Sequence, residues 1–154
     1  MINSINHSPI LIDCTLRDGG YYNKWDFEFS LIEKYLHAIS SAGINFVELG
    51  FRSQKKDNYF GPLAYCTDNF ISKLKIPDTI QIGVMINASE IRESKNFQEI
   101  MNNLFPVKAS NSKVSLVRIA TTLEDIEYAI KAGEWLKNQK YLIGLNLMQI
   151  ATLS

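Results

Sequence analysis

The sequence lacks the features that would assign it to a membrane or to a nucleic acid. Its formal net charge is zero, which gives no electrostatic case for a nucleic-acid partner or an anionic membrane surface. No apolar run approaches the ~20 residues that span a bilayer. The N-terminal segment has neither the basic region nor the apolar core of a secretory signal. These absences favour a cytoplasmic protein without a membrane partner.

Cysteines and the common nucleotide-binding motifs are also scarce. Cys14 and Cys66 are the only cysteines, and they offer neither a Cys-x-x-Cys metal site nor a disulfide framework. We expect both to be small buried apolar residues. Neither GxGxxG nor a P-loop follows the first strand-like segment, so the usual signature of a doubly wound nucleotide-binding fold is missing.

What the sequence does contain is a recurring set of short segments rich in isoleucine, valine and leucine. They mostly lack strict polar alternation, as is typical of parallel strands buried on both faces. The expected strands are Ile10–Cys14, Asn45–Leu49, Ile80–Ile86, Val114–Ile119 and Tyr141–Leu147.

Helical spacing of apolar residues fills the intervals between these segments. We expect helices over Phe27–Ile39, Thr67–Leu74, Asn96–Leu104 and from Thr121 to Leu136. Gly43 has the position of a helix stop, and Thr121 with Glu124 has the spacing of a capping box. We interpret Gly19 and Gly20 as a turn after the first strand. The alternation predicts right-handed βαβ units in a parallel sheet.

Polar residues lie at or just beyond the end of every expected strand, and this distribution favours a (β/α)₈ barrel over an open sheet. A full barrel is typically ~250 residues long, whereas this chain has 154. We therefore predict an α/β fold that is a partial TIM barrel, with residues 1–154 as one domain holding the first five βα units. The polar residues are Arg17, Asp18, Glu48, Arg52, Asn87, Arg118, Asn146 and Gln149.

The first strand delivers Arg17 and Asp18 next to the glycine pair, in the segment ILIDCTLRDGG. A carboxylate at a strand end suits a hard divalent cation, and an adjacent arginine supplies positive charge where an enolate or oxyanion develops. Glu48, one strand over, is placed to orient that arginine through an ion pair. The alternative from the residues alone is a surface ion-pair cluster.

The strings DCTLRDGG and VELGFRS resemble the metal-dependent carbon–carbon lyases and synthases called DRE-TIM metallolyases, which share the pyruvate carboxyltransferase domain. These include 3-hydroxy-3-methylglutaryl-CoA lyase and 4-hydroxy-2-oxovalerate aldolase. The resemblance implies that Asp18 is a ligand of Mn²⁺ or Mg²⁺ and that Arg17 stabilises the enolate of a 2-oxo acid. Glu48 would hold Arg17 in place.

The sequence departs from this family at two points. Tyr21 stands where the aldolase branch often has an acid–base histidine, so we count Tyr21 among the catalytic candidates as a hydrogen-bond donor. The family also takes metal ligands from a His-x-His pair on a late strand, and this chain has only His7 and His37. The expected metal site is therefore incomplete, and we expect metal binding by this chain alone to be weak or absent.

Three further residues are candidates for substrate binding: Arg52, Arg118 and Asn146. The substrate class implied by the resemblance is a 2-oxo acid or an acyl thioester. The leading interpretation is the N-terminal part of a carbon–carbon lyase that ends before the His-x-His ligands. The alternatives are an inactive half barrel with a binding or assembly role and an open α/β domain that binds a small anion. A second copy or a companion C-terminal fragment is the expected protein partner.

Overall fold

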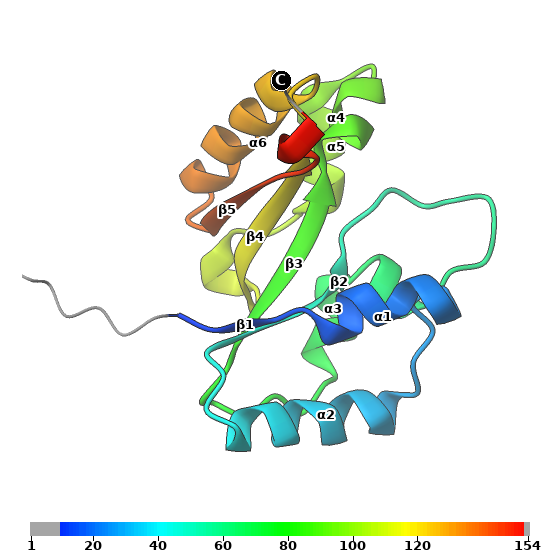
Figure 1. Cartoon of the computed structure of the whole chain (residues 1–154), viewed down its shortest axis with the longest axis vertical. Helices are drawn as coiled ribbons and strands as arrows, with labels where there is room; N and C mark the ends of the chain where they lie inside the picture. The colour runs from blue at the N-terminus through cyan, green and yellow to red at the C-terminus, as the bar shows by residue number, and fades with distance from the viewer. Residues whose placement is uncertain (1–9, 153–154) are drawn as a thin grey trace, which may run out of the picture.

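The computed structural model describes residues 10–152, which form one parallel sheet of five strands in the order β1-β2-β3-β4-β5 (Figure 1). Every strand pairs in parallel with the strand that precedes it in the sequence. The sheet curls into half of a barrel, which confirms the predicted partial (β/α)₈ architecture. The strands are β1 (Ile12–Asp13), β2 (Phe46–Phe51), β3 (Gln81–Asn87), β4 (Val114–Thr121) and β5 (Leu142–Leu147).

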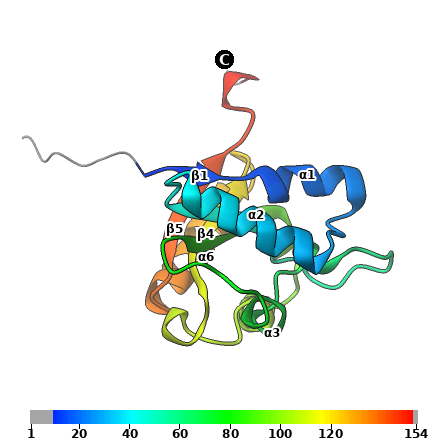
Figure 2. The ribbon, with the colours of Figure 1, turned by 90° about the horizontal axis from the view of Figure 1, so that it is seen from below.

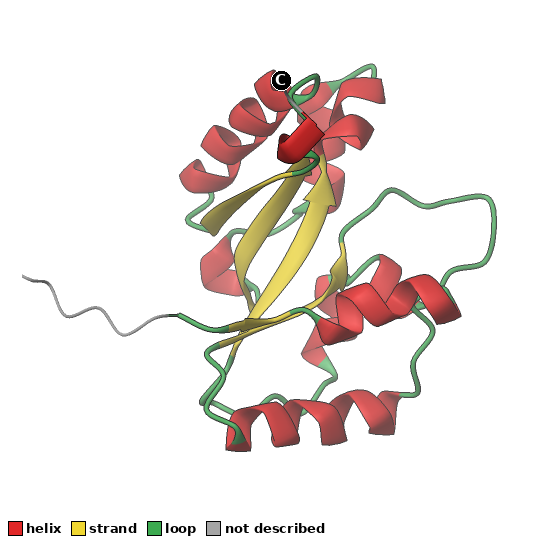
Figure 3. Cartoon of the chain, in the orientation of Figure 1, coloured by secondary structure: helices red, strands yellow, loops and turns green. Residues whose placement is uncertain are grey.

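Helices connect the successive strands (Figure 3). Helix α6 packs on β4 and β5, and α4 packs on β3 and β4. The α-helices are α1 (Thr15–Asn23), α2 (Phe29–Ser41), α3 (Asp68–Ser72), α4 (Ala88–Glu93), α5 (Phe97–Leu104) and α6 (Ile126–Asn138). Short 3₁₀ helices cover Pro62–Ala64, Ala109–Asn111 and Ile150–Thr152. The segment that follows β5, red in Figure 2, projects away from the helices.

The core lies between the sheet and the helices, and the alternation of side chains along β4 and β5 separates it from the concave face. Ile119 and Ile143 lie directly beneath Gly133 of α6, so they face the helices. Their neighbours Arg118 and Gly144, which pair across the two strands, must therefore face the concave side.

The prediction that Gly19 and Gly20 form a turn is wrong, because both lie inside helix α1. A Cβ atom at Gly20 would stand only 2.0 Å from Cδ1 of Trp25. The glycine is needed for this close approach of the indole ring, and the sequence gives no sign of it. The indole Nε1 donates a hydrogen bond to the carbonyl oxygen of Arg17 (2.9 Å), and this bond holds Trp25 against α1.

The other helix predictions hold in outline, with one wrong cap and one helix not predicted. Gly43 has φ +75 just beyond α2, as expected of a helix stop. The capping box is wrong, because Thr121 is the last residue of β4 and Asp125 precedes α6. Helix α4 was not predicted. None of the helices within residues 10–152 is long and apolar enough to cross a bilayer.

The two edges of the sheet leave large apolar side chains exposed. On the β1 side these are Ile10, Leu11 and Ile12, and on β5 they are Leu142 and Leu145. A closed barrel has no edges, whereas this half barrel has two. Strand β1 is also shorter than expected, with two residues instead of five, which fits a strand with a neighbour on one side only.

Candidate functional site

A buried carboxylate on the concave face holds two arginines. The Nε of Arg17 donates to Oε1 of Glu48 at 2.7 Å, and Nη1 of Arg118 donates to Oε2 of Glu48 at 3.1 Å. Glu48 is fully buried, while the Arg17 and Arg118 side chains are 14% and 20% exposed. This confirms the expectation that Arg17 reaches Glu48 at one end of the sheet.

The curvature of the sheet brings these residues together. Glu48 lies on β2 and Arg118 on β4, with β3 between them, and Gly83 of β3 stands opposite Glu48 in the register. The carboxylate of Glu48 and the guanidinium of Arg118 meet across β3 on the concave side. We call the group of Arg17, Glu48, Arg118 and Asn146 the concave cluster.

Strand β5 positions Arg118 from its other side. Nη2 of Arg118 donates to Oδ1 of Asn146 at 3.0 Å. Gly144 is paired with Arg118, and a Cβ atom at Gly144 would stand 3.1 Å from Cγ of Arg118. The glycine therefore lets the stem of the arginine lie close against β5.

Helix α1 carries the remaining polar groups at the mouth of the concave cluster. Nη1 of Arg17 donates to Oδ1 of Asp18, whose side chain is 62% exposed. Asp18, Tyr21 and Cys14 line an open cavity of about 710 Å³. Tyr21 is exposed and packs its ring edge-on against Trp25, with 4.8 Å between ring centroids. Nη2 of Arg17 has no protein partner among residues 10–152, so it is free to bind an anion.

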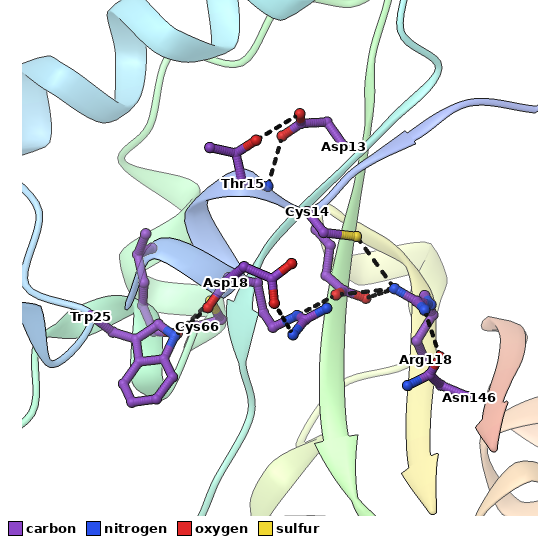
Figure 4. Close-up of polar contacts among 11 residues, drawn as sticks. Asp13, Cys14, Thr15, Asp18, Trp25, Cys66, Arg118 and Asn146 are labelled. Atoms are coloured by element: carbon purple, nitrogen blue, oxygen red, sulfur yellow. Dashed lines mark hydrogen bonds and ion pairs between the residues drawn. The ribbon is translucent and has the colours of Figure 1, made fainter. Parts of the chain in front are cut away.

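Cys14 joins this group, which the sequence did not predict. It is only partly buried, and Nη1 of Arg118 lies 3.3 Å from its Sγ (Figure 4). Burial raises the pKa of the Cys14 thiol, and the charge of Glu48 adds to this, so the group stays protonated at neutral pH. The only sequence signal is the place of Cys14 at the end of the first strand. Cys66 is fully buried, as predicted.

The start of α1 is held by a second set of hydrogen bonds. Asp13 accepts from the backbone N–H and the hydroxyl of Thr15 (3.1 and 3.0 Å), and from the hydroxyl of Tyr35 on α2 (2.7 Å). Burial raises the pKa of Tyr35 to about 12. These bonds fix the direction in which α1 leaves β1, and so where Arg17 and Asp18 point. The Asp-x-Thr spacing is the signal that marks this turn.

Arg52 does not join the concave cluster. Its side chain is 1% exposed, on the helix-covered side of β2. All three of its nitrogens donate inside the protein, to the carbonyls of Cys66 and Leu104 and to Asp68. The neighbouring Phe51 instead lies beneath the guanidinium of Arg17, with 5.9 Å from Cζ to the ring centroid.

The residues that the structure describes do not fit a complete metal site. Between residues 10 and 152, no three His, Cys, Asp or Glu side chains are grouped so that they could hold a metal ion. Asp18 is a single exposed carboxylate that also accepts from Arg17. His37 is exposed on α2, and His7 lies outside the described residues. Further ligands would have to come from elsewhere.

Comparison with known proteins is informative at the level of solved structures. No family model and no curated protein matches the chain. Among solved structures, it is similar to the N-terminal domain of a "putative aldolase" from Bacteroides vulgatus, with a TM-score of 0.81 and 28% sequence identity. The match covers 94% of this chain and 46% of the other, so the chain spans about half the length of its relative. This similarity supports an aldolase-like relationship.

Proposed function

We propose that this chain supplies the N-terminal part of the active site of a carbon–carbon lyase of the aldolase type, and that its substrate is a 2-oxo acid. The observation that carries the proposal is the meeting of Arg17, Glu48 and Arg118 on the concave side, toward the carboxyl ends of the strands. This is the end of the barrel at which TIM-barrel enzymes hold their substrates. A surface ion-pair cluster would not need a fully buried carboxylate that binds two arginines.

Arg17 is the proposed catalytic residue. Cleavage next to a carbonyl leaves an enolate, whose negative oxygen needs a fixed positive group close by. Burial alone lowers the pKa of Arg17, but the hydrogen bond and the charge of Glu48 outweigh this and raise it. Arg17 is therefore charged throughout the working pH range, and Glu48 fixes its direction while leaving Nη2 for the substrate.

Arg118 and Asn146 are the proposed binding residues for the substrate carboxylate. Arg118 is the second positive group facing the concave side, and its Nε has no protein partner among residues 10–152. Tyr21 is proposed to donate a hydrogen bond from the mouth of the site. Among residues 10–152, Asp18 is the proposed metal ligand, and this part of the chain holds no group of three such side chains that would complete the site.

The proposal includes a partner that completes the barrel. A (β/α)₈ barrel needs eight strands, and residues 10–152 provide five. The exposed apolar residues of β1 and β5 lie where further strands would pair, and the chain of the similar protein is about twice as long. We infer that a polypeptide carrying three further βα units pairs with both edges and brings the missing ligands.

An activity assay of the chain, alone and completed, tests the proposed function. The completed form is a fusion of residues 1–154 to the part of the Bacteroides vulgatus protein that follows the matched region. Pyruvate release from 4-hydroxy-2-oxo acids is followed with added Mn²⁺. We expect no turnover by the chain alone and turnover by the fusion.

Matched variants of the fusion separate the proposed roles from general damage. Arg17→Lys should lower kcat by at least about a hundredfold, as expected when a group that stabilises an oxyanion is displaced. Arg92→Lys, on α4 and outside the concave cluster, should leave kcat unchanged. A folded fusion that releases pyruvate equally well with and without Arg17 would refute the assignment.

A further inference from the structure

A second cavity lies away from the concave cluster, beside the loop that follows β2. It has a volume of about 700 Å³, within the range of sites for small molecules. The loop of residues 53–61 extends past α1 in both ribbon views (Figures 1 and 2). Apolar side chains, among them Phe60, Tyr65, Leu104 and Pro106, line the cavity together with Lys55 and Lys56. We call it the outer cavity.

The outer cavity and the concave cluster lie on opposite faces of β2. Phe51 faces Arg17 and Tyr21. The next residue, Arg52, points the other way and lines the outer cavity between α3 and the end of α5. A ligand in the outer cavity would therefore not touch the concave cluster.

The side of the outer cavity between α3 and α5 is held in place by contacts within the protein. Arg52 joins the carbonyls of Cys66 and Leu104 to the carboxylate of Asp68, and its guanidinium stacks on Phe105 with 5.0 Å from Cζ to the ring centroid. These contacts tie together segments far apart in the sequence. Such a preformed wall lowers the ordering cost of binding a small molecule.

The charges at the outer cavity favour an anion. Arg52 is neutralised by its ion pair with Asp68, so it adds nothing to the net charge. The remaining charged lining residues are Lys55 and Lys56 against Asp57, which leaves one net positive charge. Nζ of Lys56 lies above the ring of Phe60, 5.2 Å from its centroid. The positive group is therefore next to the apolar wall.

We propose that the outer cavity binds a small organic anion with a flat apolar body, of the kind of an aryl carboxylate. The flat body packs among Phe60, Tyr65 and Leu104, and the anionic group reaches Lys55 and Lys56. This binding is independent of the proposed lyase site, and it holds whether or not that site turns over a substrate.

The probe is 2-naphthoate, and its neutral counterpart is 2-naphthalenemethanol, each titrated into the full chain and followed by amide chemical shifts. We expect saturable binding of naphthoate with shifts centred on residues 53–68 and 103–106. The double variant Lys55→Gln/Lys56→Gln should bind naphthoate about tenfold more weakly, as expected for two exposed ion pairs. The neutral probe should not distinguish the double variant from the wild type.

Two blocking variants test the place of binding. Asn103→Trp, from the end of α5, and Ser53→Phe, from the loop, each fill the outer cavity and should abolish binding of both probes. Asn102→Trp and Lys95→Gln change exposed residues outside it and should leave binding unchanged, as should Arg17→Lys. Unsaturable binding to the wild type, or binding that survives both blocking variants, would overturn the proposal. Unchanged affinity for naphthoate in the double lysine variant would overturn its anionic part.

Discussion

The buried carboxylate of Glu48 compensates the positive charges of two arginines that lie on different elements. Arg17 comes from α1 and Arg118 from β4. Neither guanidinium has another buried acid within the concave cluster, since Asp18 is largely exposed. Removing the charge of Glu48 leaves two partly buried cations without compensation, which is a costly arrangement in a protein interior.

We predict that Glu48→Gln lowers the free energy of unfolding by about 3 kcal/mol, the low end of the cost of breaking a buried ion pair. Urea denaturation measures it. Glu124→Gln is the control, because Glu124 pairs with Arg92 at 80% exposure and should change stability by less than about 1 kcal/mol. Equal effects of the two substitutions would mean that Glu48 does not hold the arginines as described.

The buried thiol of Cys66 predicts a loss of stability in alkali. Burial raises its pKa from 9.0 to about 12, so the folded state keeps a proton that the unfolded state loses. The stability gained is complete below pH 9 and is lost as the pH rises from 9 to 12. The free energy of unfolding should therefore fall between pH 8 and 10, and fall less steeply in Cys66→Ala.

Below pH 10 the effect of this thiol can be distinguished from that of the tyrosines, because the ordinary pKa of a tyrosine is 10.0. Cys14 contributes in the same direction, because its pKa is also raised. In Cys14→Ser, the free energy of unfolding should therefore still fall with pH by the amount that Cys66 contributes. Parallel curves for the wild type and Cys66→Ala would contradict the account.

At the scale of elements, two helical glycines have opposite surroundings. A Cβ atom at Gly133 of α6 would meet Ile119 and Ile143 at 3.8 Å, an ordinary contact, whereas one at Gly20 of α1 would meet Trp25 at 2.0 Å. The same change, glycine to alanine in a helix, should therefore stabilise one element and disrupt the other.

We predict that Gly133→Ala raises the free energy of unfolding by about 1 kcal/mol through helix propensity. Gly20→Ala should lower it by about 3 kcal/mol, as expected of overpacking against a buried ring. Thermal and urea denaturation compare the two variants, and tryptophan fluorescence should shift in Gly20→Ala alone. A stabilising Gly20→Ala would show that α1 does not pack on Trp25 as described.

The sequence predicts the concave cluster better than it predicts the elements that carry it. Arg17 and Glu48 could be paired because they lie at or just beyond the ends of neighbouring expected strands, whose carboxyl ends meet at one edge. Helix α1 could not be predicted, because a Gly-Gly pair disfavours a helix and the compensating contact with Trp25 is tertiary. The approach of Cys14 to Arg118 across two strands depends on the curl of the sheet, which periodicity does not encode.

At the scale of the whole molecule, the exposed edges predict self-association. Neither β1 nor β5 carries a lysine or a proline that would discourage pairing. Light scattering after size exclusion should give a mass above the 17.5 kDa of one chain, increasing from micromolar to millimolar concentration. Leu142→Lys on β5 should reduce this association, and Leu123→Lys, exposed away from the edges, should not.

A cooperatively melting monomer at every concentration would contradict this prediction. The edge strands would then be protected from pairing with another chain, although the exposed apolar residues of β1 and β5 predict the opposite. The inference that a companion polypeptide completes the barrel would lose its main support, whereas the geometry of the concave cluster would stand.

Titration with oxalate shows whether the concave cluster binds the anion of a 2-oxo acid. Oxalate resembles the planar enolate of such an acid and needs no companion polypeptide. The Nε–H signals of the arginines are followed by NMR. We expect saturable shifts at Arg17 and Arg118, with affinity weakened at least about tenfold by Arg17→Lys and unchanged by Arg92→Lys. Absence of saturable binding, or equal binding in both variants, would contradict this proposal.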